Sequence, residues 1–365
     1  MEVYTLRETK DNNLNKIIRL KQKQNGNVYF AVLGEGVAKK DVRCLEKPIF
    51  IHIRVTNKCN LKCPYCYTQD NNLKKDMSDD EIKSLINICD KEGALNITWT
   101  GGEPFARKKM CEFINIAYKM GINQTVLTNG TLLTADILKS LPTDNITLQI
   151  SLNEIWSNDI SIGKRQISIL QNISRAINSG FNIVITVIFE PVEITRYECL
   201  IETLISYKIP IVRFGFEVPV GGLSQKDMYT YISDMKKMFL QLNKLKEKYI
   251  NDIVIIYQFD KYCVDETLFP KRFLSCEAGT TQIYIDNNGD VYPCPLFKSY
   301  NEFLCGNVLC NSWEELWNSK PMESFRNVSI CENCEVLCTD WCRALLYPLN
   351  KSLEGKSVYC LKTIE

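Results

Sequence analysis

The chain has 365 residues, of which 45% are hydrophobic and 24% charged, so we expect one large domain and a smaller one. Its 44 basic and 43 acidic residues give a formal charge of +1, which argues against nucleic acid as a main partner. The sequence shows no export signal and no apolar stretch of roughly 18 residues, so we predict a cytoplasmic protein with no membrane partner.

Residues 1–45, an N-terminal extension of unknown role, show only weak alternation, which predicts a short strand pair or an extension that lies on the main domain. Residues 46–222 then repeat a unit in which a short apolar run is followed by an amphipathic stretch of helical period. Six such units follow one another, beginning with PIFIHIRV at 48–55. Parallel β/α units of this kind, with strands buried on both faces, favour a barrel or a doubly wound sheet.

Local signals mark where the helices begin and end. SDDE at 78–81 predicts a capping box at the start of the first helix. Gly93, Gly121 and Gly180 each fall where a helix should end before the next strand. These signals support the positions of the repeated units.

The pattern changes after the sixth unit. Residues 223–262 predict a bridging helix, at about 224–249, and a strand. Residues 263–365 are rich in loops and contain one hairpin signal, TQIYIDNNGDVYPC at 281–294, in which NNG supplies the turn. We expect this last segment to form a separate small domain.

Cysteine usage points to metal. The chain contains 17 cysteines and a single histidine, His52. Clustered thiols in a large chain without an export signal indicate metal sites rather than a disulfide framework. Because one histidine rules out most mixed Cys/His zinc patterns, iron–sulfur clusters or zinc held by four cysteines remain.

The segment CNLKCPYCY at 59–67 places Cys59, Cys63 and Cys66 directly after the first strand of the repeat. Loops at this end of parallel β/α strands carry chemistry. Three thiolates can hold three irons of a four-iron cluster and leave the fourth iron open for a small ligand. Three structural cysteines or a zinc knuckle are the alternative, which the lack of a fourth soft ligand nearby disfavours.

This loop, with Tyr65 before its last cysteine, resembles the cluster-binding loop of the radical S-adenosylmethionine (SAM) superfamily. TGGEP at 100–104, after the second strand, resembles the family motif for the methionyl amine. Gly101 and Gly102 would let the backbone approach a ligand, and Glu103 would accept charge-assisted hydrogen bonds from the ammonium group. The resemblance implies an α/β fold, a partial (β/α)6 TIM-like barrel with a loop-rich C-terminal auxiliary-cluster domain.

Two further strand ends match positions at which this family contacts cofactor or substrate. They carry Asn129, in LTNGT after the third strand, and Ser151, in ISLN after the fourth. Arg165 and Arg175 are candidate partners of the cofactor carboxylate, against the alternative that each is a surface arginine.

The resemblance also implies the reaction. A reduced [4Fe-4S] cluster on the first three cysteines would pass one electron into bound SAM, whose carbon–sulfur bond breaks. The resulting 5′-deoxyadenosyl radical would abstract hydrogen from the substrate, so the cofactor carries the difficult chemistry. The protein would exclude water and oxygen and place one C–H bond beside the radical carbon. An electron donor such as flavodoxin or ferredoxin is an implied partner.

A second group of cysteines lies near the C-terminus and resembles the SPASM extension, which holds auxiliary four-iron clusters in peptide-modifying enzymes. The resemblance assigns one cluster to Cys276, Cys294 and Cys342, and the other to Cys331, Cys334, Cys338 and Cys360.

One spacing departs from the family pattern, because only three residues separate Cys334 from Cys338. We therefore expect one or two auxiliary clusters. Cys263 is either a fourth ligand of the first cluster or an ordinary buried cysteine, in which case that iron is open. A pair of zinc sites is the competing interpretation, since spacing alone does not separate it from iron–sulfur clusters.

The expected function is oxidative modification of a ribosomally synthesised precursor peptide, forming a thioether or carbon–carbon crosslink. The alternatives are oxidation of serine or cysteine to formylglycine, as in anaerobic sulfatase maturation, or another radical SAM dehydrogenase, epimerase or decarboxylase. Sulfatase-maturing enzymes carry aspartate directly after the cysteine of the Y-P-C segment, where this chain has Pro295. A non-catalytic iron–sulfur scaffold would have no use for TGGEP.

Peptide-modifying relatives often bear a full N-terminal leader-binding domain with a winged-helix pattern. The residues before the barrel, 1–45, are too few for such a domain. Leader recognition is therefore expected to use this extension, the barrel mouth or a separate leader-binding protein.

Overall fold

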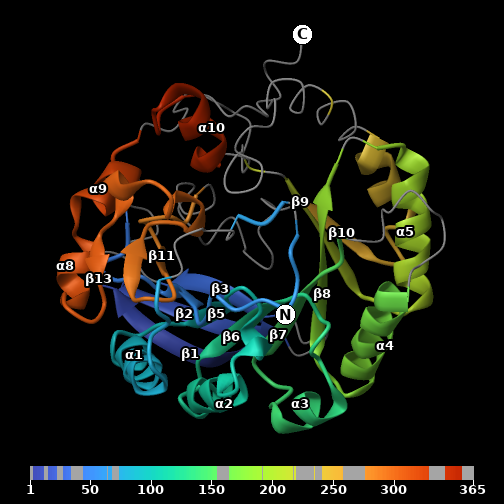
Figure 1. Cartoon of the computed structure of the whole chain (residues 1–365), viewed down its shortest axis with the longest axis horizontal. Coiled ribbons are helices and arrows are strands. Elements are labelled where there is room, and N and C mark those ends of the chain that lie inside the picture. Colours follow the sequence, from blue (N-terminus) through green and yellow to red (C-terminus); the bar gives the residue numbers. More distant parts are fainter. Residues whose placement is uncertain are drawn as a thin grey trace.

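The structure is a computed structural model. It describes residues 3–11, 15–22, 28–33, 44–63, 65–67, 74–153, 164–190, 192–216, 218, 234, 241–257, 276–328 and 342–355. Figure 1 shows a curved central sheet whose helices lie around its outside.

Seven parallel strands form the body of the molecule, and each pairs with the next along the chain. They are β4 (Phe50–Arg54), β5 (Asn96–Thr100), β6 (Asn123–Thr128), β7 (Ile146–Ser151), β8 (Asn182–Phe189), β9 (Ile211–Phe216) and β10 (Val254–Tyr257). In the described part of the chain this sheet does not close on itself, and the predicted partial TIM-like barrel is confirmed.

Five helices connect the first six of these strands and cover the convex side of the sheet (Figure 1). They are α1 (Asp79–Lys91), α2 (Met110–Lys119), α3 (Ala135–Ser140), α4 (Lys164–Asn178) and α5 (Ile194–Ser206). A short 3-10 helix, η2 (Pro104–Ala106), precedes α2. Residues 241–248 are helical, as expected for the end of the bridging helix, whose earlier part lies mostly outside the described residues.

The predicted helix boundaries are confirmed. Ser78 and Glu81 form a capping box at the start of α1. Gly93, Gly121 and Gly180 have φ of 79°, 73° and 87°, the left-handed conformation that glycine adopts with little strain after a helix. The helices therefore end where the sequence places the next strand.

The core lies between the sheet and these helices. Every residue of β5 is buried, because this strand lies between helices on one side and the barrel interior on the other. The buried face of α1 follows the helical period, with Ile82, Leu85 and Ile86 at most 2% exposed. Burying each such side chain contributes about 1.5 to 3 kcal/mol to folding.

The C-terminal part adds strands to the same sheet, beside β4. The expected hairpin is confirmed as β11 (Gln282–Ile285) and β12 (Asp290–Tyr292), with Gly289 at φ 90° in its turn. β11 pairs in parallel with β4, and β12 pairs with the short β13 (Gly306–Asn307). The hairpin therefore joins the strand that leads into the three-cysteine loop.

Short helices follow the hairpin. They are η5 (Pro295–Phe297), η6 (Asn301–Phe303), α8 (Trp313–Trp317), α9 (Lys320–Arg326) and α10 (Arg343–Asn350). Phe297 is buried among the rings of Phe303, Phe325 and Tyr347, at centroid distances of 4.7, 5.0 and 5.7 Å. This aromatic cluster ties α9 and α10 to the end of the hairpin.

At the N-terminus, β1 (Val3–Asp11), β2 (Asn15–Gln22) and β3 (Val28–Leu33) form a separate antiparallel sheet. The predicted strand pair is thus a three-stranded sheet. Among the helices of the described residues, none has the length and apolar character needed to cross a bilayer.

Candidate active site

A cavity of about 630 Å³ opens at the carboxyl ends of the barrel strands. This is the edge at which parallel β/α folds place their ligands. Eight of the predicted site residues line it: Cys59, Cys63, Tyr65, Cys66, Gly101, Gly102, Asn129 and Ser151. The cavity thus brings together residues from the ends of four different strands.

The three cysteines of the loop after β4 all face this cavity. Cys59 is exposed, whereas Cys63 and Cys66 are half-buried. The backbone N–H of Cys66 donates to the carbonyl of Cys63 over 3.1 Å, and the N–H of Leu61 donates to Sγ of Cys59 over 3.4 Å. Desolvation raises the pKa of Cys59, and the neighbouring charges of Glu103 and Cys66 raise it further.

This donor set fits an iron–sulfur cluster. A [4Fe-4S] cluster takes each thiolate on a different iron, so its ligands need not converge on one point. In the part of the chain that the structure describes, no three Cys, His, Asp or Glu side chains converge on the position of a single metal ion. Three soft thiols on one loop, open to the same cavity, are the ligands that such a cluster uses.

The two glycines after β5 lie against the residues that lead into the cysteine loop. The N–H of Gly102 donates to the carbonyl of Thr56, and the N–H of Glu103 donates to that of Lys58, both over 2.8 Å. A Cβ on Gly102 would lie 2.5 Å from the carbonyl oxygen of Lys58 and 2.7 Å from that of Asn57. Glycine is required here because two backbone segments touch.

Glu103 is fully buried and is not among the residues that line the cavity. Its carboxylate accepts hydrogen bonds from the hydroxyl of Thr128 (2.7 Å) and the N–H groups of Asn129 (2.8 Å) and Phe105 (3.2 Å). Burial raises its pKa, and these three donors oppose the rise. The described contacts give Glu103 a positioning role for Asn129, while the expected contact with the methionyl ammonium stays a prediction.

Asn129 in turn holds the cysteine loop. Its Nδ2 donates to Oδ1 of Asn60 over 2.9 Å, and Nδ2 of Asn60 donates to Oγ1 of Thr131 over 2.8 Å. Asn60 follows Cys59 directly, so these bonds connect the loop after β6 to the first cysteine. The sequence prediction missed Asn60, because nothing local to it indicates that its partners lie after β6.

The two remaining cavity predictions lie in different surroundings. Ser151, at the end of β7, is exposed and lines the cavity. Arg165 is exposed on α4 and is not one of the lining residues. Arg54 was not predicted, yet it lines the cavity at 2% exposure and forms an ion pair of 2.9 Å with Asp286.

Two cysteines of the second group, Cys294 and Cys342, lie close enough to its other thiols for their pKa values to be affected. Burial raises the pKa of Cys342 to about 12, and the charge of Cys276 adds to the rise. Burial also raises the pKa of Cys294 well above its usual value, with contributions from the other two thiols. Cys331, Cys334, Cys338, Cys360 and Cys263 lie outside the described residues.

Comparison with known families identifies both parts of the chain. The model of the radical SAM superfamily matches residues 53–194, which include the three-cysteine loop and the glycine pair. The model of the SPASM iron–sulfur cluster-binding domain matches residues 276–338.

Curated relatives cover much of the chain. Mycofactocin maturase MftC of Mycolicibacterium smegmatis is 24% identical over 345 residues, which are 88% of this chain and 84% of the relative. The antilisterial bacteriocin subtilosin biosynthesis protein AlbA of Bacillus subtilis is 26% identical over 279 residues. Those residues are 74% of this chain and 60% of that relative.

Solved structures share the fold. Streptococcus suis SuiB bound to S-adenosylmethionine has a TM-score of 0.70 at 20% identity, over 88% of this chain and 79% of that chain. Native anSMEcpe with bound AdoMet has a TM-score of 0.67 at 18% identity, over 86% of this chain and 94% of that chain. Because the first model covers the three-cysteine loop and the second begins at Cys276 and includes Cys294, the chain belongs to the radical SAM superfamily as an enzyme with a SPASM domain, which uses [4Fe-4S] clusters and SAM.

Proposed function

We propose that this enzyme oxidatively modifies a ribosomally synthesised peptide, forming a thioether or carbon–carbon crosslink. The observation that carries the proposal is the similarity to a mycofactocin maturase along 88% of this chain. AlbA, named for the biosynthesis of a bacteriocin, supports the same class of substrate.

The predicted site residues have two roles: some would hold the radical cluster, and others would position SAM. Cys59, Cys63 and Cys66 would hold the radical cluster, and cluster and SAM together would supply the 5′-deoxyadenosyl radical. Asn129 and the backbone of the glycine pair line the cavity beside the cysteines, where they would orient SAM. The cavity walls would exclude water from the reacting atoms.

The second cysteine group would hold auxiliary clusters, which would supply an acceptor for the electron that remains after hydrogen abstraction. Forming a crosslink removes two hydrogens from the peptide: one leaves with the deoxyadenosyl carbon, and the other leaves as a proton and an electron. We assign Cys276, Cys294 and Cys342 to one auxiliary cluster, and Cys331, Cys334, Cys338 and Cys360 to the other. An electron donor such as flavodoxin or ferredoxin would reduce the radical cluster.

Recognition of the peptide leader would fall to the three-stranded N-terminal sheet, the barrel mouth or a separate leader-binding protein. We expect the enzyme to work in the cytoplasm, where precursor peptides are made.

Glu103→Gln is expected to weaken SAM binding about tenfold, with the radical cluster still assembled. The amide turns an N–H₂ group toward the N–H of Asn129 or the hydroxyl of Thr128, so one of these donors loses its acceptor. Equilibrium binding of SAM and iron content measure the two effects. Glu112→Gln is the control, because this residue of α2 pairs only with Lys83 of α1 and with Lys109 in the described contacts. Equal SAM affinity of Glu103→Gln and parent would contradict the role.

The proposed function is tested with short peptides encoded beside the gene. Reduced, anaerobically reconstituted enzyme is mixed with SAM and each peptide, and the products are analysed by mass spectrometry. We expect a peptide that has lost two hydrogens, formed together with 5′-deoxyadenosine. A cysteine thiol that can be alkylated in the starting peptide but not in the product identifies a thioether. A decarboxylated or epimerised peptide, or formylglycine, would replace the crosslink proposal with one of the alternatives.

A further inference from the structure

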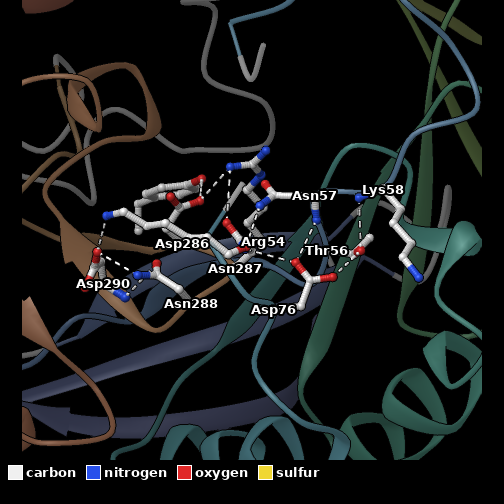
Figure 2. A network of polar contacts seen from close by, with 11 residues as sticks. Arg54, Thr56, Asn57, Lys58, Asp76, Asp286, Asn287, Asn288 and Asp290 are labelled. Carbon is white, nitrogen blue, oxygen red and sulfur yellow. Dashed lines mark hydrogen bonds and ion pairs between the residues drawn. The ribbon is translucent and has the colours of Figure 1, made fainter. Parts of the chain in front are cut away.

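A network of polar contacts joins the hairpin turn of the SPASM domain to the residues just before Cys59 (Figure 2). On the hairpin side it contains Asp286 and Asn287, which are 5% and 1% exposed. Nη1 of Arg54, the last residue of β4, donates to Oδ1 of Asp286 over 2.9 Å and lies 3.4 Å from Oδ1 of Asn287. The turn is therefore fixed against the strand that ends at the cavity.

A second branch of the network runs through Asp76. Nδ2 of Asn287 donates to Oδ1 of Asp76 over 2.9 Å and to the carbonyl of Lys74 over 3.1 Å. The amide of Asn287 thus uses both of its N–H donors on the segment before α1. A side chain held in this way has little freedom to turn.

Asp76 holds the backbone that leads into the cysteine loop. Its Oδ1 accepts from the N–H of Asn57 over 2.9 Å, and its Oδ2 accepts from the hydroxyl of Thr56 over 2.6 Å. The same hydroxyl accepts from the N–H of Lys58 over 3.1 Å. Figure 2 shows Asp76 between Asn287 and these residues. The three residues that precede Cys59 are thus held by one carboxylate, which Asn287 orients.

Hydrogen bonds to a carboxylate are stronger than those between neutral groups, and burial strengthens them further. Thr56 is 1% exposed and Asp76 half-buried, so water competes little for these bonds. Without the bond from Asn287, the carboxylate of Asp76 keeps only the bonds from Thr56 and Asn57, so it is held less firmly against the backbone of Asn57. The cysteine loop would then shift relative to the glycine pair on its other side.

We propose that Asn287 and Asp76 are positioning residues for the radical cluster, so that the hairpin turn of the SPASM domain sets the place of the cysteine loop over the SAM cavity. The SPASM domain then acts on the radical site through geometry, in addition to carrying clusters of its own. The proposal does not depend on the peptide substrate, because every measurement below is made without peptide.

The test compares Asn287→Ala with the neighbouring Asn288→Ala in reconstituted full-length enzyme. The side chain of Asn288 contacts only Asp290 within the same turn in the described contacts, which makes it a matched control. For Asn287→Ala we expect about tenfold weaker SAM binding and an altered electron paramagnetic resonance spectrum of the reduced cluster with SAM, at unchanged iron content. Asn288→Ala should match the parent in all three.

Thr56→Val provides an independent second variant if Asn287→Ala does not fold. Valine keeps the shape of threonine but removes the hydroxyl that bonds to both Asp76 and Lys58. We therefore again expect weaker SAM binding and an altered spectrum of the reduced cluster with SAM. A parent-like SAM affinity and spectrum in the folded variant, with only a lower melting temperature, would show that the network merely stabilises the domain contact and would overturn the proposal.

Discussion

Replacing Cys59, Cys63 and Cys66 together with alanine is expected to remove about four irons per chain and to abolish cleavage of SAM. These are the only thiols among the described residues that line the cavity, so no other described cysteine there could take over. Without the cluster no electron reaches SAM. Iron analysis of the reconstituted protein and chromatographic detection of 5′-deoxyadenosine measure the two losses.

The triple variant should still fold, because none of the three side chains is fully buried. Cys199→Ala is a suitable control, since Cys199 is exposed on α5 and does not line the cavity. It should keep its iron and cleave SAM like the parent. Formation of 5′-deoxyadenosine by the folded triple variant would show that the radical cluster is bound elsewhere.

The repeated units of the barrel could be predicted because their signals are local. An apolar run, an amphipathic stretch and a glycine at the helix end suffice to define a β/α unit, and Gly93, Gly121 and Gly180 have the expected positive φ. The pairing of β11 with β4 has no such signal. These strands come from opposite halves of the chain, and the hairpin sequence specifies only its own turn, at Gly289.

In the candidate site, too, features with a local sequence signal could be predicted, and contacts between distant residues could not. Cysteine spacing and the glycine pair are sequence patterns, and the structure places them around one cavity. Asn60 and Arg54 were missed because their partners, Asn129 and Asp286, are distant in sequence and adjacent only in the fold.

Glu103 illustrates a subtler limit of sequence reasoning. The motif indicates that a carboxylate belongs at this position, but not whether its partner is a ligand or the protein. In the structure its carboxylate oxygens accept hydrogen bonds from three groups of the protein itself, one of which is a backbone N–H of the loop after β6. Residue type predicts charge and bonding capacity, whereas the partner depends on packing.

Gly102→Ala is expected to reduce SAM cleavage about a hundredfold and to destabilise the fold by about 1 to 3 kcal/mol. The added Cβ would meet the carbonyl oxygens of Lys58 and Asn57 at 2.5 and 2.7 Å. Both contacts are backbone atoms, which cannot rotate aside as a side chain can. Residues 57 and 58 must therefore move away from Gly102, and the cysteine loop moves with them. This movement breaks the bonds of 2.8 Å that Gly102 and Glu103 donate to Thr56 and Lys58.

Gly180→Ala is the control that distinguishes the displacement of the cysteine loop in Gly102→Ala from a general loss of stability. A Cβ at Gly180 meets nothing within 4 Å, yet its φ of 87° makes alanine unfavourable by about 1 to 2 kcal/mol. Its melting temperature should therefore fall while SAM affinity and cleavage stay at the parent level. If Gly102→Ala lost stability to the same extent but also cleaved SAM at the parent rate, the contact between the glycine pair and the cysteine loop would have no part in positioning the radical cluster. We expect instead that Gly102→Ala loses cleavage under conditions in which it remains folded, because the atoms that must move lie one and two residues before Cys59.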